Sequence, residues 1–356
     1  MMGLFVLIVS YVLLDSIINY CKMFVKNPLP IPHQEPFEAN LRPQTWQEYL
    51  GQEKLKSNLR VIIDAAKTRE EPLEHMLFYG NPGLGKTTLA RVVAHEMATP
   101  IQTCTAPTLE KTGDLASLLA NLQEGEILFL DECHRLQKTV MEMLYSALED
   151  FTLHLVMGKG AMARTMDLEL PRFTLVAATT RVALLPAPFR NRFGAIFQIP
   201  FYTKEDIEKI LLRSSRIFGL SIKPEALSLI ASRSRYTPRI ANRILKRVRD
   251  FATIEGSNAI DLPTAKKALA FLEIDEMGLE PADRKILETL AVTFTGKPVG
   301  IQSLAASLAE EEDTILDIYE PYLLQMGLIE RTSRGRVATP LTYKHLGLPY
   351  SQQGLL

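Results

Sequence analysis

The sequence has 356 residues, more than one hydrophobic core usually organises, so we expect two or three packed domains. Its 40 basic and 41 acidic side chains leave a formal net charge of -1, so any contact with nucleic acid must come from local basic patches. Cys21, Cys104 and Cys133 have neither CxxC spacing nor a histidine pair at ligand distance, which argues against a zinc site or a disulfide framework and favours a reducing cytoplasm.

The chain begins with an apolar extension at residues 1–26. Residues 3–14 are apolar apart from Ser10 and Tyr11, but a membrane-spanning helix needs about 20 apolar residues. The segment also lacks the basic region and the cleavage site of a secretory signal. We therefore expect an extension without membrane association, or a protein that starts at Met23; a membrane anchor is the alternative.

Residues 27–40 form a proline-rich linker, and an α/β domain is expected at residues 41–202. Strand-like and helix-like segments alternate along this domain, which predicts a parallel sheet covered by helices. Short, largely apolar runs are typical of the buried central strands of such a sheet. These runs lie at residues 75–79, 126–130 and 173–178.

A β-hairpin is predicted within this domain, at residues 152–170. Apolar and polar residues alternate there on both sides of a Gly-Lys-Gly turn at residues 158–160. The hairpin either protrudes from the domain or folds back onto it.

Two further domains are expected after the α/β domain. Apolar positions recur every three or four residues from Lys204 onward, which predicts a small helical domain at residues 203–273. Residues 274–350 combine helices with a short hairpin around a Ser-Arg-Gly turn, a pattern typical of a winged helix. The helices are expected near residues 283–291, 301–309 and 313–325, the strands at residues 328–332 and 336–339, and a tail at residues 351–356.

A phosphate-binding loop is the most specific motif of the chain. Residues 80–88 read GNPGLGKTT, which matches GxxxxGK[ST], and they lie between an apolar strand and a helix that we expect to begin at Leu89. In such a loop, backbone N–H groups surround a polyphosphate, while Lys86 reaches the β and γ phosphates and the Thr87 hydroxyl binds Mg²⁺. The sequence therefore predicts binding of ATP and Mg²⁺, with the nucleotide held by Gly83, Gly85, Lys86, Thr87 and Thr88.

Two carboxylates follow the apolar run at residues 127–130. We expect Asp131 to hold Mg²⁺ together with Thr87, and Glu132 to orient the attacking water. The pair predicts hydrolysis as well as binding of the nucleotide. His134 is either a switch residue near the nucleotide or a packed histidine at the end of a strand.

Between about residues 41 and 347, the chain resembles the RuvB family of AAA+ ATPases. Its most specific matching segments are LEDF at 148–151, TPRIANR at 237–243, and RGR at 334–336 followed by HLG at 345–347. The resemblance implies an AAA+ P-loop ATPase domain, a small helical lid domain and a C-terminal winged-helix DNA-binding domain.

The function implied by this resemblance is an ATP-dependent motor that drives branch migration of Holliday junctions in DNA recombination and repair. The resemblance also implies a homo-hexameric ring around double-stranded DNA, working beside a RuvA-like junction protein. That protein would dock on the hairpin at residues 152–170, with Leu155, Val156 and Met157 as contact candidates.

The resemblance assigns further residues to the nucleotide. Thr180, beside Thr179, would read the γ phosphate, Arg192 would be an arginine finger that reaches a neighbour's ATP, and Arg239 would be a second sensor. For both arginines, an ordinary surface charge is the alternative. Leu41, Arg42 and Tyr202 would line the adenine pocket, and Glu149, Asp150 and Phe151 would approach the nucleotide from a subunit interface. We therefore expect catalysis to depend on Lys86, Asp131, Glu132, Thr180 and Arg192.

A cluster of three arginines marks the expected DNA-facing end of the winged helix. Arg331, Arg334 and Arg336 surround the tip of the predicted wing, where guanidinium groups can bind phosphates without reading bases. Glu312 stands where the family typically carries a DNA-contacting arginine, and an acid there repels phosphate.

Two other functions remain open from the sequence. A clamp-loader-like AAA+ ATPase would share the phosphate loop and the carboxylates but would remodel a protein partner on DNA. A membrane-tethered remodelling ATPase is suggested only by the apolar residues 3–14.

Overall fold

The computed structural model describes residues 41–157 and 164–350. The apolar extension, the proline-rich linker, the hairpin turn and the tail lie outside these ranges. The chain divides into two compact units, residues 1–42 and residues 43–356, and the fold below is that of the second unit. Among the described helices, none is long and apolar enough to cross a membrane.

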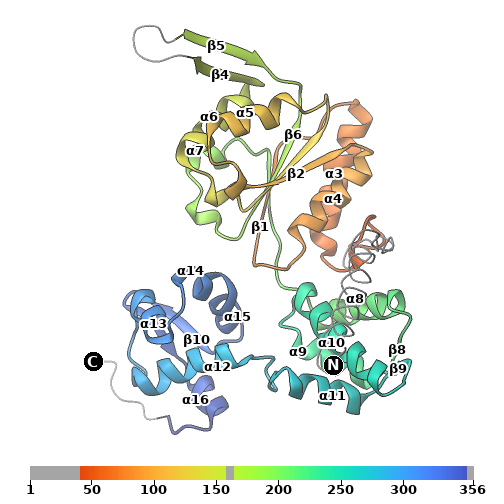
Figure 1. The fold of residues 1–356 in the computed structure, drawn as a ribbon, viewed down its shortest axis with the longest axis vertical. Helices are drawn as coiled ribbons and strands as arrows, with labels where there is room; N and C mark the ends of the chain where they lie inside the picture. The colour runs from red at the N-terminus through yellow and green to blue at the C-terminus, as the bar shows by residue number, and fades with distance from the viewer. Residues whose placement is uncertain (1–40, 158–163, 351–356) are drawn as a thin grey trace, which may run out of the picture. The chain divides into compact units, whose positions relative to one another are not determined.

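A five-stranded parallel sheet forms the centre of the first domain, with the strand order β2-β3-β6-β1-β7 (Figure 1). The three apolar runs of the sequence are confirmed as its three middle strands. At the carboxyl edge of the sheet, Tyr79 pairs with Thr179 on one side and with Gln198 on the other. The strands are β1 (Met76–Tyr79), β2 (Ile101–Thr105), β3 (Ile127–Asp131), β6 (Thr174–Thr179) and β7 (Ala195–Gln198).

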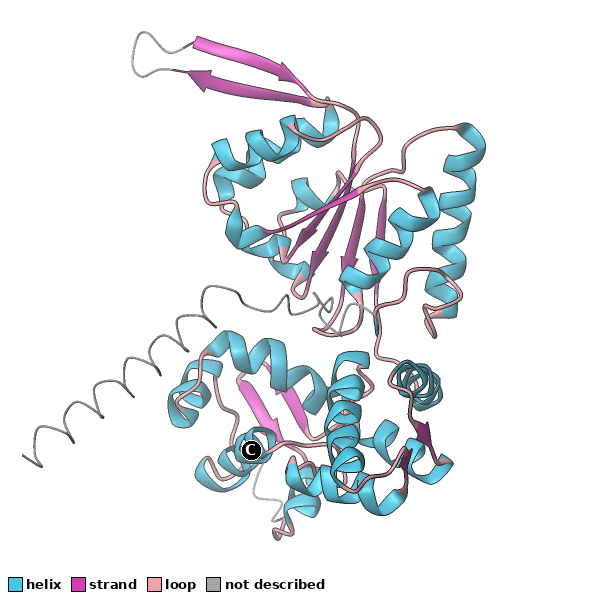
Figure 2. Cartoon of the chain, turned by 45° about the vertical axis from the view of Figure 1, so that its right-hand side comes forward, coloured by secondary structure: helices cyan, strands magenta, loops and turns pink. Residues whose placement is uncertain are grey.

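Helices cover both faces of this sheet (Figures 1 and 2). Because side chains alternate along a strand, β1 sends Met76 and Phe78 into the core beneath α3 and α4, and Leu77 into the core beneath α5 and α6. The helices are α3 (Glu53–Arg69), α4 (Lys86–Met97), α5 (Thr112–Ala120), α6 (Lys138–Glu149) and α7 (Ala187–Arg190), with short 3-10 turns at Ala106–Thr108, Cys133–Arg135 and Val182–Leu184.

The helix after the phosphate loop begins at Lys86, so the expected start at Leu89 was wrong. Gly85 caps this helix with φ at +98°, a backbone conformation that glycine adopts without strain. The helix can therefore start directly after the last loop glycine. Lys86 and Thr87 are held in its first turn, where the orphan N–H groups of the helix also lie.

The predicted hairpin is present as antiparallel β4 (Thr152–Met157) and β5 (Arg164–Glu169), and it projects from the sheet domain (Figure 1). Leu153 is buried at its base, while His154 and Asp167 form an exposed pair at 2.6 Å between Nδ1 and Oδ1. The structure does not describe the side chains of residues 155–157, so their contact role stays a prediction.

Four helices form the small helical domain. Along α10, the fully buried residues recur at the spacing of one helix face, which gives the domain its core. Thr203 and Asp261 cap two of the helices by accepting from the backbone N–H three residues on. The elements are α8 (Lys204–Ile217), β8 (Ser221–Ile222), α9 (Pro224–Arg233), α10 (Pro238–Ile254), β9 (Ala259–Ile260) and α11 (Leu262–Phe271).

The winged helix is confirmed, with its hairpin turning at Ser333 and Arg334. Gly335 has φ at +139°, and a Cβ atom there would lie 2.3 Å from the Val299 carbonyl oxygen, so the close approach of the two segments requires glycine. The helices are α12 (Pro281–Glu288), α13 (Ile301–Leu308), α14 (Glu312–Thr314), α15 (Glu320–Gln325) and α16 (Pro340–Leu346), with π-helical turns at Thr289–Thr293 and Ile315–Tyr319. The strands are β10 (Ile329–Thr332) and β11 (Gly335–Ala338).

Candidate nucleotide-binding and hydrolysis site

The phosphate loop passes close to two other parts of the chain. Gly80 adopts φ at +151°, and a Cβ atom there would lie 2.5 Å from the Ile199 carbonyl oxygen. At Gly83, a Cβ atom would lie 2.9 Å from the Thr237 Cγ2 and 3.0 Å from the Arg239 Cβ. Glycine at these positions lets the loop fit between β7 and the start of α10.

Lys86 is buried at the centre of the loop. Its Nζ donates to the Gly80 carbonyl at 2.7 Å and to the Asn81 carbonyl at 3.1 Å. Burial lowers the pKa of the Lys86 ammonium, an effect that the nearby carboxylates of Glu132 and Asp131 oppose. These bonds hold the Lys86 ammonium against the backbone of the loop, where a phosphate is expected to bind.

The residues expected to bind Mg²⁺ contact one another. The Thr87 hydroxyl donates to the Asp131 Oδ2 at 3.3 Å, and the Asp131 Oδ1 accepts from the Glu132 N–H at 3.0 Å. Adjacent ligands of an octahedral Mg²⁺ are about 2.9 Å apart, and Mg²⁺ takes few protein ligands because phosphates and water supply the rest. One hydroxyl and one carboxylate at this separation fit the ion.

Glu132 lies one residue beyond the strand, with φ at +52°. Its Oε2 accepts from the Thr180 hydroxyl at 3.4 Å and lies 3.2 Å from the Nδ1 of His134. The carboxylate and the threonine predicted to sense the γ phosphate are therefore side by side, at the carboxyl ends of β3 and β6. In open α/β sheets, this edge is where ligands bind.

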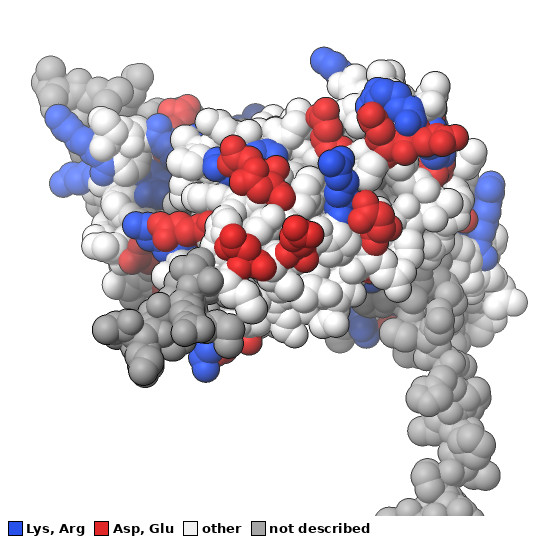
Figure 3. Space-filling view, turned by 90° about the horizontal axis from the view of Figure 1, so that it is seen from above, with Lys and Arg blue, Asp and Glu red and all other residues white. Residues whose placement is uncertain are grey.

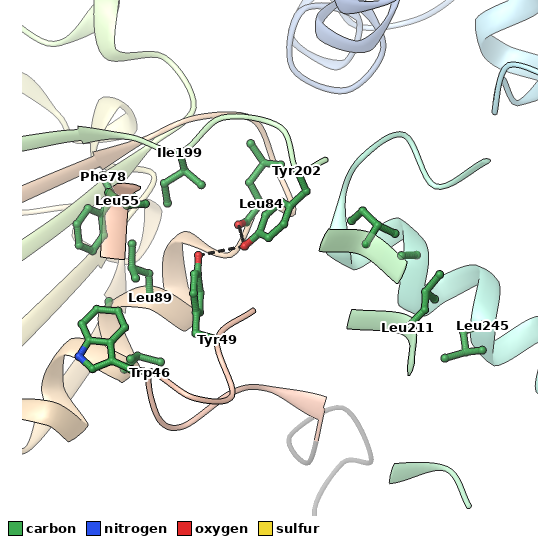
Figure 4. Close-up of a cluster of buried hydrophobic side chains, with 14 of the residues drawn as sticks. Trp46, Tyr49, Leu55, Phe78, Leu84, Leu89, Ile199, Tyr202, Leu211 and Leu245 are labelled. Atoms are coloured by element: carbon green, nitrogen blue, oxygen red, sulfur yellow. Dashed lines mark hydrogen bonds between the residues drawn. The ribbon is translucent and has the colours of Figure 1, made fainter. Parts of the chain in front are cut away.

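Tyr202 and Arg239 also border the loop. The Tyr202 hydroxyl donates to the Tyr49 hydroxyl at 3.2 Å and lies 3.4 Å from the Leu84 carbonyl (Figure 4). Burial raises the pKa of Tyr202 and brings that of Tyr49 to about 12, so both stay neutral. Arg239 is exposed in the first turn of α10, beside Gly83.

Tyr49 was not predicted as a site residue from the sequence. In the structure, a Cβ atom on Gly85 would lie 3.3 Å from its hydroxyl. No motif surrounds it. Only its packing beneath the loop reveals that it supports Gly85.

The structure does not bring Arg192 or residues 149–151 to this edge of the sheet. Arg192 precedes β7, and Phe151 packs with its ring centroid 6.0 Å from that of His75, which precedes β1. Both therefore lie at the amino edge, separated from the loop by the length of β1, about 13 Å for four residues.

Arg192 is docked on its own subunit in this structure. Its Nη2 donates to the Glu149 Oε2 at 2.7 Å, its Nη1 donates to the Pro188 carbonyl at 2.8 Å, and its guanidinium lies over the Tyr145 ring. Glu149 and Asp150 are exposed at the end of α6. Within this chain, these residues therefore do not reach the phosphate loop, and their predicted role at a nucleotide stays a prediction.

Leu41 and Arg42 were predicted to line the adenine pocket. Leu41 is buried and Arg42 is exposed. They belong to the first compact unit, so their role at the site remains a prediction.

The wing arginines differ from one another. Arg331 and Arg336 both pair with the Glu320 carboxylate, at 2.7 Å and 2.8 Å, and Glu320 is 1% exposed. Although burial opposes ionisation of Glu320, the hydrogen bonds from these arginines hold its pKa below the usual value. Arg334 is exposed, and its side chain pairs with no acid in the described part of the chain. Glu320 was not predicted from the sequence, where its signal is an acid between the core-facing residues of a helix.

Glu312, which stands where the family typically carries a DNA-contacting arginine, is exposed at the first position of α14. On a different part of the molecule, the end seen from above in Figure 3, acidic and basic side chains are interspersed, in keeping with the net charge of -1.

Comparisons with known proteins cover almost the whole described chain. Three family models match in succession: the Holliday junction DNA helicase RuvB P-loop domain at residues 41–199, the RuvB AAA lid domain at residues 202–275, and the RuvB C-terminal winged helix domain at residues 276–347.

Individual relatives agree with these models. The chain is 52% identical over 329 residues to the Holliday junction branch migration complex subunit RuvB of Chloroflexus aurantiacus, covering 92% of this chain and 94% of that protein. The protein of the same name from Chloroflexus aggregans matches with the same identity and coverage. The solved structure of the Thermotoga maritima RuvB Holliday junction branch migration motor has a TM-score of 0.81 at 45% identity, covering 87% of this chain and 99% of that one.

Proposed function

The chain belongs to the RuvB family, and from this premise we propose that it is an ATP-hydrolysing motor that drives branch migration of Holliday junctions. One observation carries the proposal. A single edge of the sheet gathers the phosphate loop, the Thr87–Asp131 contact and the Thr180–Glu132 contact, in a chain that ends in a winged helix.

Binding of ATP uses the loop N–H groups and Lys86. When phosphates enter, the Lys86 ammonium exchanges its bonds to the Gly80 and Asn81 carbonyls for bonds to phosphate oxygens. Thr87 and Asp131 would hold Mg²⁺, whose charge neutralises the phosphate oxygens when it is bound. The first turn of α4 adds the positive end of a helix dipole.

Hydrolysis is assigned to Glu132. Its carboxylate accepts a proton from the attacking water, whose oxygen bonds to the γ phosphorus as the bond to the ADP oxygen breaks. Thr180 contacts the Glu132 carboxylate, so a change at the γ phosphate is transmitted to the residue that orients the water.

The remaining groups come from a second copy of the chain. Arg192 and residues 149–151 lie at the opposite edge of the sheet from their own loop, which supports an arginine supplied to a neighbour's ATP within a homo-hexameric ring. The exposed Arg334 supports sequence-independent binding of DNA phosphates. The projecting hairpin supports docking of a RuvA-like protein. We propose that the chain itself works in the cytoplasm.

The test is a migration assay on a synthetic four-way junction, with ATP, Mg²⁺ and the cognate RuvA-type protein. The wild-type chain should separate the junction into duplex products, and Arg192→Ala should not. Arg216→Ala removes an exposed arginine of α8 and should behave as wild type. Equal migration by Arg192→Ala, or a five-subunit open ring in place of a hexamer, would contradict the proposal.

A further inference from the structure

His134 lies beneath the carboxylate that the proposed hydrolysis requires. It follows β3 in the 3-10 turn Cys133–Arg135, and its side chain is only 7% exposed. Its Nδ1 lies 3.2 Å from the Glu132 Oε2 and 2.9 Å from the Thr179 Oγ1. One ring nitrogen thus faces two oxygen atoms from two strands.

The Thr179 hydroxyl limits how these contacts are made. Its Oγ1 accepts from the Arg181 N–H at 3.0 Å, which leaves the hydroxyl proton free to be donated elsewhere. If Nδ1 of His134 carries no proton, it accepts a hydrogen bond from that hydroxyl, and its lone pair then also faces the Glu132 carboxylate. If Nδ1 carries a proton, it can donate to either oxygen, and donation to the carboxylate forms a charge-assisted hydrogen bond.

The second arrangement is the one that holds Glu132 in place. Burial lowers the pKa of His134 and so favours the neutral ring, whose one proton can lie on either nitrogen. A protonated Nδ1, 3.2 Å from Oε2, can donate to the same oxygen that accepts from the Thr180 hydroxyl. The other oxygen, Oε1, stays available to a water molecule.

We propose that His134 is a positioning residue for hydrolysis: protonated on Nδ1, it fixes Glu132 beside Thr180 and directs the free carboxylate oxygen toward the attacking water. The other tautomer accepts from Thr179, repels the carboxylate and releases Glu132. The inference rests on the proposed ATPase function and adds to it a residue outside the phosphate-loop and carboxylate motifs.

The first experiment compares the steady-state kinetics of His134→Ala and His134→Asn in the full chain. Loss of the donor should lower kcat on the order of 10-fold to 100-fold, as expected for a displaced catalytic group, with little change in the KM for ATP. Asn places an amide N–H near the position of Nδ1 and should recover part of the kcat. His95→Ala, at an exposed histidine of α4, should leave both constants unchanged.

The second experiment repeats the substitution in a Glu132→Gln background under single-turnover conditions. If His134 acts through the carboxylate, the double variant should be no slower than Glu132→Gln alone. A further loss in that background, or a rise in KM together with a lower Tm in His134→Ala, would overturn the inference in favour of a structural histidine. Wild-type kcat in His134→Ala would overturn it while leaving the ATPase function intact, whereas a wild-type chain without ATPase activity would remove the proposed function itself.

Discussion

At the start of the phosphate loop, Gly80 passes directly over the carbonyl of Ile199. Its φ of +151° belongs to a region that only glycine adopts without strain, which costs other residues about 1–3 kcal/mol. Gly80→Ala should therefore push the loop away from β7. We expect a lower Tm and an ATP dissociation constant raised at least about 10-fold, because about 1.4 kcal/mol corresponds to a factor of ten.

Gly113→Ala is the matched control for this substitution. Gly113 lies in α5, where a Cβ atom would meet nothing within 4 Å. Alanine there should stabilise the protein by about 0.5–1 kcal/mol through its higher helix propensity, without affecting the nucleotide. Unchanged ATP affinity in Gly80→Ala, measured by calorimetry, would show that the loop tolerates the displacement.

Glu132 offers a test of hydrolysis separate from binding. Glu132→Gln keeps the size of the side chain and an oxygen acceptor for Thr180, but it removes the base. ATP should bind with wild-type affinity, while turnover should fall by at least on the order of 100-fold, the lower end of general-base contributions. Undiminished phosphate release would remove Glu132 from the mechanism.

At the scale of elements, the wing combines a buried acid, Glu320, with two arginines that pair with it and a third, Arg334, that does not. Arg336 is 16% exposed and pairs with Glu320, whereas Arg334 lies exposed at the turn. Arg334→Ala should weaken binding to duplex DNA of any sequence and reduce the salt-dependence slope by about 0.9, the value for one phosphate contact.

Arg336→Ala should instead act through stability. It removes hydrogen bonds to a buried carboxylate, each contributing about 1.5–3 kcal/mol, so unfolding of the winged helix should occur at a lower temperature. A larger change in salt slope for Arg336→Ala than for Arg334→Ala, measured by fluorescence anisotropy, would reverse these assignments.

The elements show which features the sequence can predict. Three short, largely apolar runs identified the middle strands because a strand buried on both faces has few polar positions. The start of α4 was misplaced by three residues because residues 86–88 belong to the loop motif, whereas in the structure Gly85, with its positive φ, caps the helix directly before Lys86. The pairing of Glu320 with Arg331 and Arg336 could not be predicted from the sequence, because it depends on how α15 packs against β10 and β11.

In the nucleotide site, too, only contiguous motifs could be predicted from the sequence. The phosphate loop and the two carboxylates were predicted because each is a short run of neighbouring residues. Tyr49 lies 153 positions from Tyr202, and only folding joins their hydroxyls. The sequence likewise could not place Arg192 at the amino edge of the sheet, since that position follows from the register of β7 on β1.

At the scale of the whole molecule, the sheet separates the loop and Glu132, at its carboxyl edge, from Arg192, at its amino edge. In the ring that we propose, the amino edge of one subunit would face the carboxyl edge of the next, so that every catalytic site would be completed at an interface. ATPase activity per subunit should therefore rise with protein concentration as the ring assembles.

Mixing two inactive variants tests this arrangement directly. Lys86→Ala loses the phosphate contact, and Arg192→Ala loses the arginine that reaches the neighbour, so each alone should hydrolyse no ATP. In an equal mixture, about a quarter of the interfaces join an intact Lys86 to an intact Arg192, and ATPase activity should return in that proportion if each site needs one group in trans.

A mixture of Lys86→Ala with Glu132→Gln is the control. Each site takes Lys86 and Glu132 from the same subunit, and every subunit of this mixture lacks one of the two. Mixing should therefore restore no activity. Recovery in the control, or none in the first mixture despite formation of mixed rings, would contradict a site divided between subunits.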